Sequence, residues 1–179
     1  MAQVRSGFQQ QFIRLARYNR WMNERLYALA AQMSDEERKL DRGAFFKSIH
    51  GTLNHILLGD RLWLARFANS GHAFAALKDH VLSPGIATLS DELYSDFTTL
   101  THERDKTDLV IDAWMAELDD AILDSTLRYK RLNGEANEQP FWLVLTHFFN
   151  HQTHHRGQVT TLFMQSGRDP GVTDLIALP

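Results

Sequence analysis

The sequence contains no cysteine among its 179 residues. This absence excludes disulfide bonds, thiolate metal sites and a cysteine nucleophile. A metal site in this chain must therefore use other ligands, and any sulfur chemistry must depend on a thiol that arrives with a small molecule. Because no disulfide can form, a cytoplasmic protein is the first expectation.

The sequence also lacks a long hydrophobic run and an excess of positive charge. Apolar runs such as residues 73–77 and 141–145 are far too short to cross a bilayer, and residues 1–5 do not begin a secretory signal. The chain carries 19 Lys and Arg against 22 Asp and Glu, which gives a net charge of -3. We therefore expect a small-molecule substrate, and neither a membrane nor a nucleic acid as partner.

Three helices are predicted in the first two thirds of the chain. Apolar residues recur at steps of three and four over residues 8–33, with Asn19 as one polar position in the stripe. Ser34 is expected to cap a short helical turn. A second helix is predicted over residues 46–67 and a third from the cap-like sequence at 89–92. Between them, residues 70–87 show no period and predict a long crossover connection.

The last third of the chain combines turn signals with one more helix. Residues 126–132 alternate in polarity and are followed by Asn133-Gly134, which predicts a small β-hairpin. Pro140 suits the first turn of a last helix, which Ser166-Gly167 ends. Four main helices with one long crossover predict an all-α four-helix bundle, formed by residues 1–179 as a single domain.

The sequence is rich in histidine, with nine in all. His151 and His155 are four residues apart, which on a helix places both imidazoles on one face. That face is apolar and directed to the core, where an unpaired imidazole nitrogen costs several kcal/mol. A divalent metal would satisfy both rings, and His55 of the second predicted helix is the best third ligand. The alternative is a buried, hydrogen-bonded histidine pair without a metal.

The neighbours of these histidines leave further alternatives open. Gly51 and Gly59 lie one turn to either side of His55; they either leave room for a bound species or simply let helices approach closely. His147 and His154 lie on the flank of the ligand face and are either outer partners of the site or ordinary boundary residues. The remaining histidines are expected at the surface or in loops, without an assigned role: His50, His72, His80 and His102.

One segment near the C-terminus reads His147-Phe-Phe-Asn-His151-Gln-Thr-His154-His155-Arg-Gly-Gln158. Together with residues 18–23, 48–57, 60–63 and 167–174, it resembles the DinB-like family of bacterial metal-binding four-helix-bundle proteins, named for damage-inducible expression. The matching segments follow in order along nearly the whole chain. The resemblance is therefore specific.

The resemblance implies helices that run up-down-down-up, often in a homodimer. It also implies a metal, usually nickel or zinc, held by one histidine of the second helix and two of the last, which correspond to His55, His151 and His155. Some members of the family are thiol-dependent transferases or isomerases that act with bacillithiol or mycothiol. A low-molecular-weight thiol cosubstrate is thus a further expectation.

Three neutral imidazoles leave a divalent metal with an open position, which is the pattern of a catalytic zinc site. This favours a metal-dependent thiol S-transferase or hydrolase that acts on a small molecule. The alternative is a non-catalytic metal- or ligand-binding stress protein. No general base stands out, although Gln158 is expected to face inward, and Asn19 either reaches the pocket or is solvated. Arginine suits the recognition of carboxylates, but the sequence does not show which arginine lies near the site.

Overall fold

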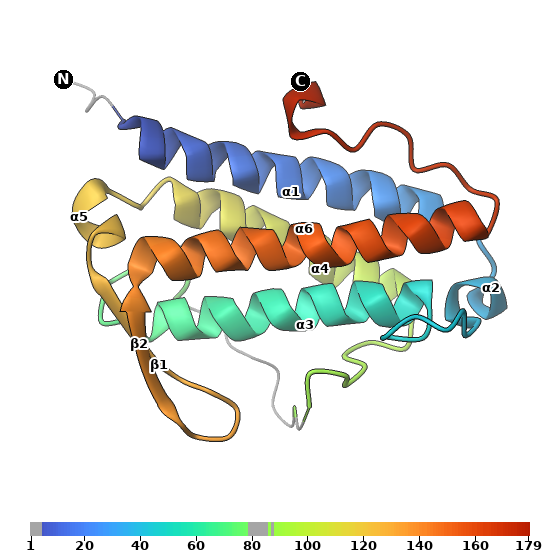
Figure 1. Ribbon diagram of the computed structural model, residues 1–179, viewed down its shortest axis with the longest axis horizontal. Coiled ribbons are helices and arrows are strands. Elements are labelled where there is room, and N and C mark those ends of the chain that lie inside the picture. The colour runs from blue at the N-terminus through green and yellow to red at the C-terminus, as the bar shows by residue number, and fades with distance from the viewer. Residues whose placement is uncertain (1–4, 79–85, 87) are drawn as a thin grey trace.

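The computed structural model describes residues 5–78, 86 and 88–179, and it is mostly helical with a small two-stranded antiparallel sheet. Figure 1 shows these elements along the chain. No helix among the described residues is long and apolar enough to cross a membrane. The elements are α1 Gly7–Ala31, α2 Asp35–Lys39, α3 Ile49–Ala68, α4 Phe97–Met115, α5 Asp120–Leu123, β1 Thr126–Lys130, β2 Ala136–Pro140, α6 Phe141–Gln165 and the 3-10 helix η1 Leu175–Ala177.

The four long helices α1, α3, α4 and α6 lie side by side (Figure 1). α1 packs against α4 and α6, and α3 packs against the same two helices. The colours of Figure 1 show that α1 and α6 run in one direction and that α3 and α4 run in the other. Ser6, Ser48 and Asp96 cap the first turns of α1, α3 and α4, and so satisfy backbone N–H groups that have no partner within the helix.

The apolar core has two parts, one toward each end of the long helices. Near the hairpin, the side chains of Phe67, Trp114 and Phe141 are fully buried in the first part. At the opposite end, Leu53 and Phe163 belong to the second part. This burial of aromatic and aliphatic faces follows from the apolar periodicity of the helices and is the main favourable contribution to folding.

Charged and amide side chains fill the space between the two apolar parts. Arg104 donates hydrogen bonds to Asp60 at 2.6 Å and to Asp108 at 2.8 Å. Asn19 donates to Asp108 at 3.0 Å, and Gln152 donates to Asp60 at 2.9 Å. All five side chains are at most 2% exposed, and mutual pairing is what makes such burial of charge tolerable. Of the two alternatives for Asn19, the solvated position is therefore wrong.

The start of α4 differs from the prediction, which placed it at residues 89–92. The helix begins at Phe97, and Asp96 accepts a hydrogen bond from the Thr99 backbone N–H at 2.7 Å. The preceding segment is held out of the helix by α3, because the Asn54 amide accepts from Tyr94 N–H at 2.9 Å and donates to Tyr94 C=O at 3.1 Å. These long-range bonds outweigh the local capping signal.

The predicted hairpin is confirmed. β1 and β2 pair antiparallel, with Thr126 opposite Pro140 and Lys130 opposite Ala136. Gly134 in the connecting turn has φ +83°, a left-handed conformation that glycine adopts without a steric penalty. Pro140 ends β2 and directly precedes Phe141, the first residue of α6, so the predicted start of this helix is off by one residue.

Candidate metal centre

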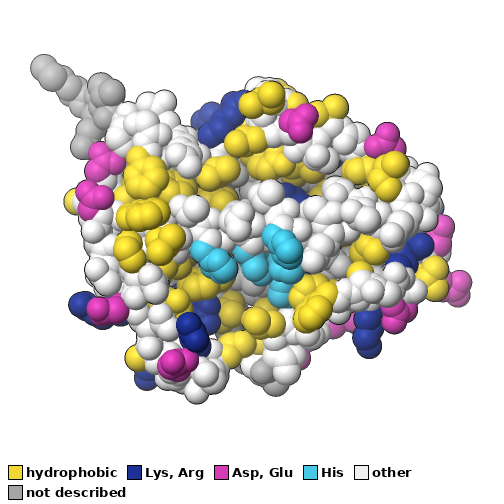
Figure 2. Space-filling view, viewed as in Figure 1, with side chains coloured by type: hydrophobic (Ala, Val, Ile, Leu, Met, Phe, Trp, Pro, Cys, Tyr) yellow, Lys and Arg dark blue, Asp and Glu magenta, His cyan; other side chains and the backbone are white. Residues whose placement is uncertain are grey.

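Three histidines from two helices form one cluster, which we call the histidine cluster (His55, His151 and His155). One ring nitrogen of each lies within 4.8 Å of the other two. His55 Nε2 is 3.3 Å from His151 Nε2 and 3.1 Å from His155 Nε2. Figure 2 shows histidine side chains gathered at the middle of one face, over α3 and α6. The structure thus brings together the three residues that the sequence singled out.

The second ring nitrogen of two of these histidines has a fixed hydrogen-bond partner. His55 Nδ1 lies 2.8 Å from the Leu89 carbonyl oxygen, and His155 Nδ1 lies 2.8 Å from Gln158 Oε1. Both partners accept hydrogen bonds, so each Nδ1 carries the proton and each Nε2 presents a lone pair. The two Nε2 atoms that approach to 3.1 Å are therefore both acceptors, so neither ring supplies a donor to the other, and a cation between them would meet this need.

A proton does not fill this need at neutral pH. Burial lowers the pKa of His55 to about 4 and that of His151 to about 3, and it also lowers the pKa of His155. All three rings are thus neutral, which is the state that binds metals. Two nitrogens on a tetrahedral zinc ion lie about 3.3 Å apart, given Zn–N bonds of about 2.0–2.1 Å. The observed Nε2–Nε2 separations of 3.1 and 3.3 Å fit this donor set.

Two glycines of α3 leave space for side chains and backbone near the histidine cluster. A Cβ atom at Gly59 would lie 2.7 Å from Cε1 of His151, so only glycine lets this ring lie against α3. A Cβ atom at Gly51 would lie 2.2 Å from the carbonyl oxygen of Phe46. Gly51 thus serves the close approach of the preceding loop, and Gly59 serves a histidine of the cluster. Gly59 thus fits the close approach of two helices, because His151 belongs to α6, whereas Gly51 meets a loop and fits neither interpretation.

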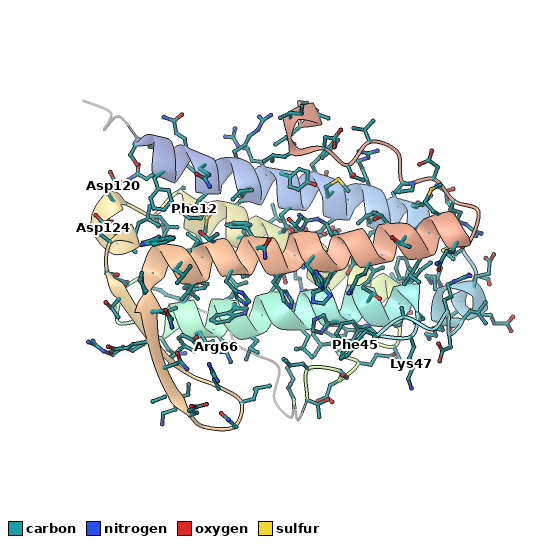
Figure 3. The ribbon with its side chains drawn as sticks, in the orientation of Figure 1. Phe12, Phe45, Lys47, Arg66, Asp120 and Asp124 are labelled. Atoms are coloured by element: carbon teal, nitrogen blue, oxygen red, sulfur yellow. The ribbon has the colours of Figure 1, made fainter. Side chains whose placement is uncertain are left out.

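An aromatic side chain that the sequence analysis missed closes one side of the cluster. The Phe46 ring stacks on His55 with centroids 3.8 Å apart and planes at 15°, and it meets His155 edge-on at 5.5 Å. Phe46 belongs to the tight loop before α3, in which Lys47 has φ 64°. Figure 3 labels the two neighbours of Phe46 in this loop, Phe45 and Lys47. The only local signal was the aromatic pair Phe45-Phe46, which has no helical period to mark it.

The buried polar network continues directly behind the cluster. Gln152 follows His151 in α6, and its amide donates to Asp60, the residue after Gly59 in α3. The negative charge of Asp60 acts on His155 and opposes the effect of burial on its pKa. Such outer partners fix the orientation and basicity of histidine rings that bind metals. The resemblance includes Asp60 in its segment 60–63, but the sequence assigned this residue no role, because a single carboxylate in an apolar helix has no spacing signal.

The other histidines have different environments. His147 and His154 are exposed; His147 packs edge-on against Trp63 at 5.2 Å, and His154 Nε2 lies 3.2 Å from Gln158 Nε2. His50 is only 1% exposed, so its expected surface position is wrong. Its Nε2 lies 2.9 Å from the Tyr94 carbonyl, within the contact that holds the segment before α4. Of the rest, His102 is exposed, His72 lies 3.0 Å from Ser125 Oγ, and His80 is outside the described residues.

Fold and site together define a mostly helical protein in which three neutral imidazoles from two helices can hold a metal ion. Comparison with known proteins agrees with this class. The chain belongs to the DinB family, whose model matches residues 5–179. It is also similar to the protein DinB of Bacillus subtilis (strain 168), with 24% identity over 162 residues, which cover 90% of this chain and 89% of that protein.

Proposed function

We propose that the histidine cluster is a metal centre in which His55, His151 and His155 hold one divalent transition metal, nickel or zinc. The observation that carries this proposal is the 3.1 Å approach of two Nε2 atoms whose rings are both protonated at Nδ1. Without a cation, two buried lone pairs would face each other at a cost in free energy. Membership in the DinB family supports the same assignment.

We further propose that the centre is catalytic, as a metal-dependent thiol S-transferase or hydrolase that acts on a small molecule. Three protein ligands leave a coordination position open, and a metal there supplies a Lewis acid. The protein's own residues hold and shape the site: Leu89 and Gln158 fix two rings, and Phe46 shields His55 from solvent. A thiol in such a reaction is a low-molecular-weight cosubstrate, because the sequence has no cysteine.

A non-catalytic metal- or ligand-binding stress protein is the alternative. One observation favours it: the cluster joins α3 to α6, so that a metal would act as a cross-link between two helices. In this case chelation lowers the stability of the protein, but no substrate is turned over. A screen of electrophiles and esters with several low-molecular-weight thiols separates the two functions, because only the enzyme gives a product whose formation stops with His151→Ala.

The metal assignment is tested by elemental analysis of purified protein. We expect about one transition metal per chain in the unaltered protein and none in His151→Ala. The matched control is His102→Ala, which removes an exposed histidine outside the cluster and should leave the metal content unchanged. Equal metal content in the protein and in His151→Ala would overturn the site.

Four more proposals concern the molecule as a whole: its topology, its oligomeric state, its location and its partners. The side-by-side packing of α1, α3, α4 and α6 and their directions in Figure 1 support a four-helix bundle of the up-down-down-up type. We also propose a homodimer in the cytoplasm, with a small-molecule substrate and no membrane or nucleic-acid partner. Sedimentation analysis tests the dimer, and the net charge of -3 supports the absence of nucleic-acid binding.

A further inference from the structure

A groove lies between α3 and the hairpin of β1 and β2. Figure 1 shows the hairpin extending below α3. The volume of the groove is about 620 Å³, which is within the range of about 300–1,000 Å³ that small-molecule sites occupy. Leu62 and Ala65 of α3 form one wall, and Tyr129 and Leu132 form the other. The groove therefore offers apolar surface to a ligand of one or two rings.

Arg66 lies in this groove, between α3 and the hairpin (Figure 3). Its guanidinium carbon is 4.3 Å from the centre of the Trp63 ring and 5.3 Å from that of the Tyr129 ring, so two aromatic faces hold it in place. Its Nε is buried without a hydrogen-bond partner, and no carboxylate pairs with Arg66 among the described residues. Desolvation by burial lowers its pKa, which shows a cation deprived of part of its hydration.

The other charged residues that line the groove also favour an anionic ligand. Arg128 and Lys130 line it as well, and Glu138 is the one acidic residue among the lining side chains. Glu138 is already paired with Arg128 at 3.1 Å. The positive charge of Arg66 is therefore not neutralised by the lining. An arginine fork matches the two oxygens of a carboxylate better than any other side chain does.

We propose that this groove binds a small organic anion, with its carboxylate on Arg66 and its apolar body against Leu62, Tyr129 and Leu132. The site does not depend on the proposed metal, because none of its lining residues belongs to the histidine cluster. The groove nevertheless lies close to the histidine cluster. The Trp63 ring, which stacks on Arg66, packs against the His147 ring with centroids 5.2 Å apart, and the centroids of the His147 and His151 rings are 6.1 Å apart.

The test measures binding of 2-naphthoate and of its neutral analogue 2-naphthamide by calorimetry, with EDTA present so that no metal contributes. We expect naphthoate to bind the unaltered protein at least tenfold more tightly than naphthamide. Arg66→Gln, which keeps most of the stacking surface and removes the charge, should abolish this preference. Arg66→Lys should retain part of it, and Arg17→Gln on the exposed face of α1 should retain all of it.

Backbone amide shifts in NMR spectra then locate the bound naphthoate. Shifts concentrated at residues 62–66 and 129–132 support the groove, whereas shifts confined to other regions would overturn it. Equal affinity of the unaltered protein for the acid and the amide would also overturn it, as would an Arg66→Gln variant that binds naphthoate normally. If Arg66→Gln loses its helical circular dichroism, the acid–amide comparison and Arg66→Lys still decide the matter.

Discussion

Single residues set the geometry of the histidine cluster, and Gly59 is the most restrictive of them. The His151 ring occupies the space where any other side chain would begin. Because an imidazole at the end of a side chain can rotate away, an added methyl group would displace the ligand more than it would strain the helix. We therefore expect the proposed metal binding and the folding stability to depend on this position to different degrees.

Gly59→Ala should weaken metal binding at least tenfold while changing the free energy of unfolding by only about 1 kcal/mol, since overpacking is offset by the better helix propensity of alanine. The measurement is metal titration against a competing chelator, together with urea unfolding in EDTA. Gly157→Ala is the control, because no atom lies within 4 Å of its added Cβ. That variant should gain about 0.5–1 kcal/mol and keep its metal affinity. Unchanged affinity in Gly59→Ala would contradict the argument.

The low pKa values of the cluster predict how the metal-free protein responds to acid. A histidine with a pKa of about 6.5 when unfolded and about 3 when folded, as for His151, takes up its proton preferentially in the unfolded state between these values. Its contribution to stability is therefore complete above about pH 6.5 and is lost as the pH falls toward 3. Asp108 acts in the opposite sense, because burial raises its pKa to about 6.

The contribution of Asp108 cancels when the unfolding free energy of a His151 variant is subtracted from that of the unaltered protein. In EDTA, the unfolding free energy of the unaltered protein minus that of His151→Gln should fall steadily between pH 6.5 and pH 4. Urea unfolding at several pH values measures this difference. A difference independent of pH would show that His151 is not held neutral by the fold.

At the scale of elements, much of the structure is predictable from local patterns. The three-to-four spacing of apolar residues locates α1 and α3, and Asn133-Gly134 locates the hairpin turn. The spacing of His151 and His155 identifies one half of the histidine cluster. The features that local patterns do not predict are those that depend on contacts between distant segments. The late start of α4, the burial of His50 and the place of Phe46 all follow from such contacts, and no local pattern encodes them.

The position of the segment before α4 should depend on Asn54 more than on Asp96, which caps α4. Asn54→Ala removes two hydrogen bonds to the Tyr94 backbone and should destabilise the protein by about 2–3 kcal/mol. It should also weaken metal binding, because the same segment supplies the Leu89 carbonyl to His55. Urea unfolding and metal titration give both effects.

Asp96→Ala is the matched comparison, because it removes a cap in the same region. It should cost about 1 kcal/mol of stability and leave metal affinity unaltered. If both variants lose metal affinity equally, the Leu89 contact does not act through Asn54.

At the scale of the whole molecule, α3 and α6 are joined both by the buried network and by the cluster. A bound metal stabilises the folded state by about 4 kcal/mol when its free concentration is a thousand times its Kd. Because a chain of this size gains about 2–4 °C in Tm per kcal/mol, removal of the metal should lower Tm by about 10 °C. Thermal unfolding with and without EDTA checks this. His151→Ala should show no response to EDTA, and a full response in that variant would refute the cross-link.

The ligands of the cluster lie far apart in the chain, with His55 separated from His151 by 96 residues and from His155 by 100. During synthesis, a nascent chain that ends before α6 carries one of the three imidazoles. The complete donor set exists only after the last long helix has left the ribosome and docked on α3. If the cluster holds a metal as proposed, a truncated chain would therefore bind none, and the metal would stabilise only the full-length protein.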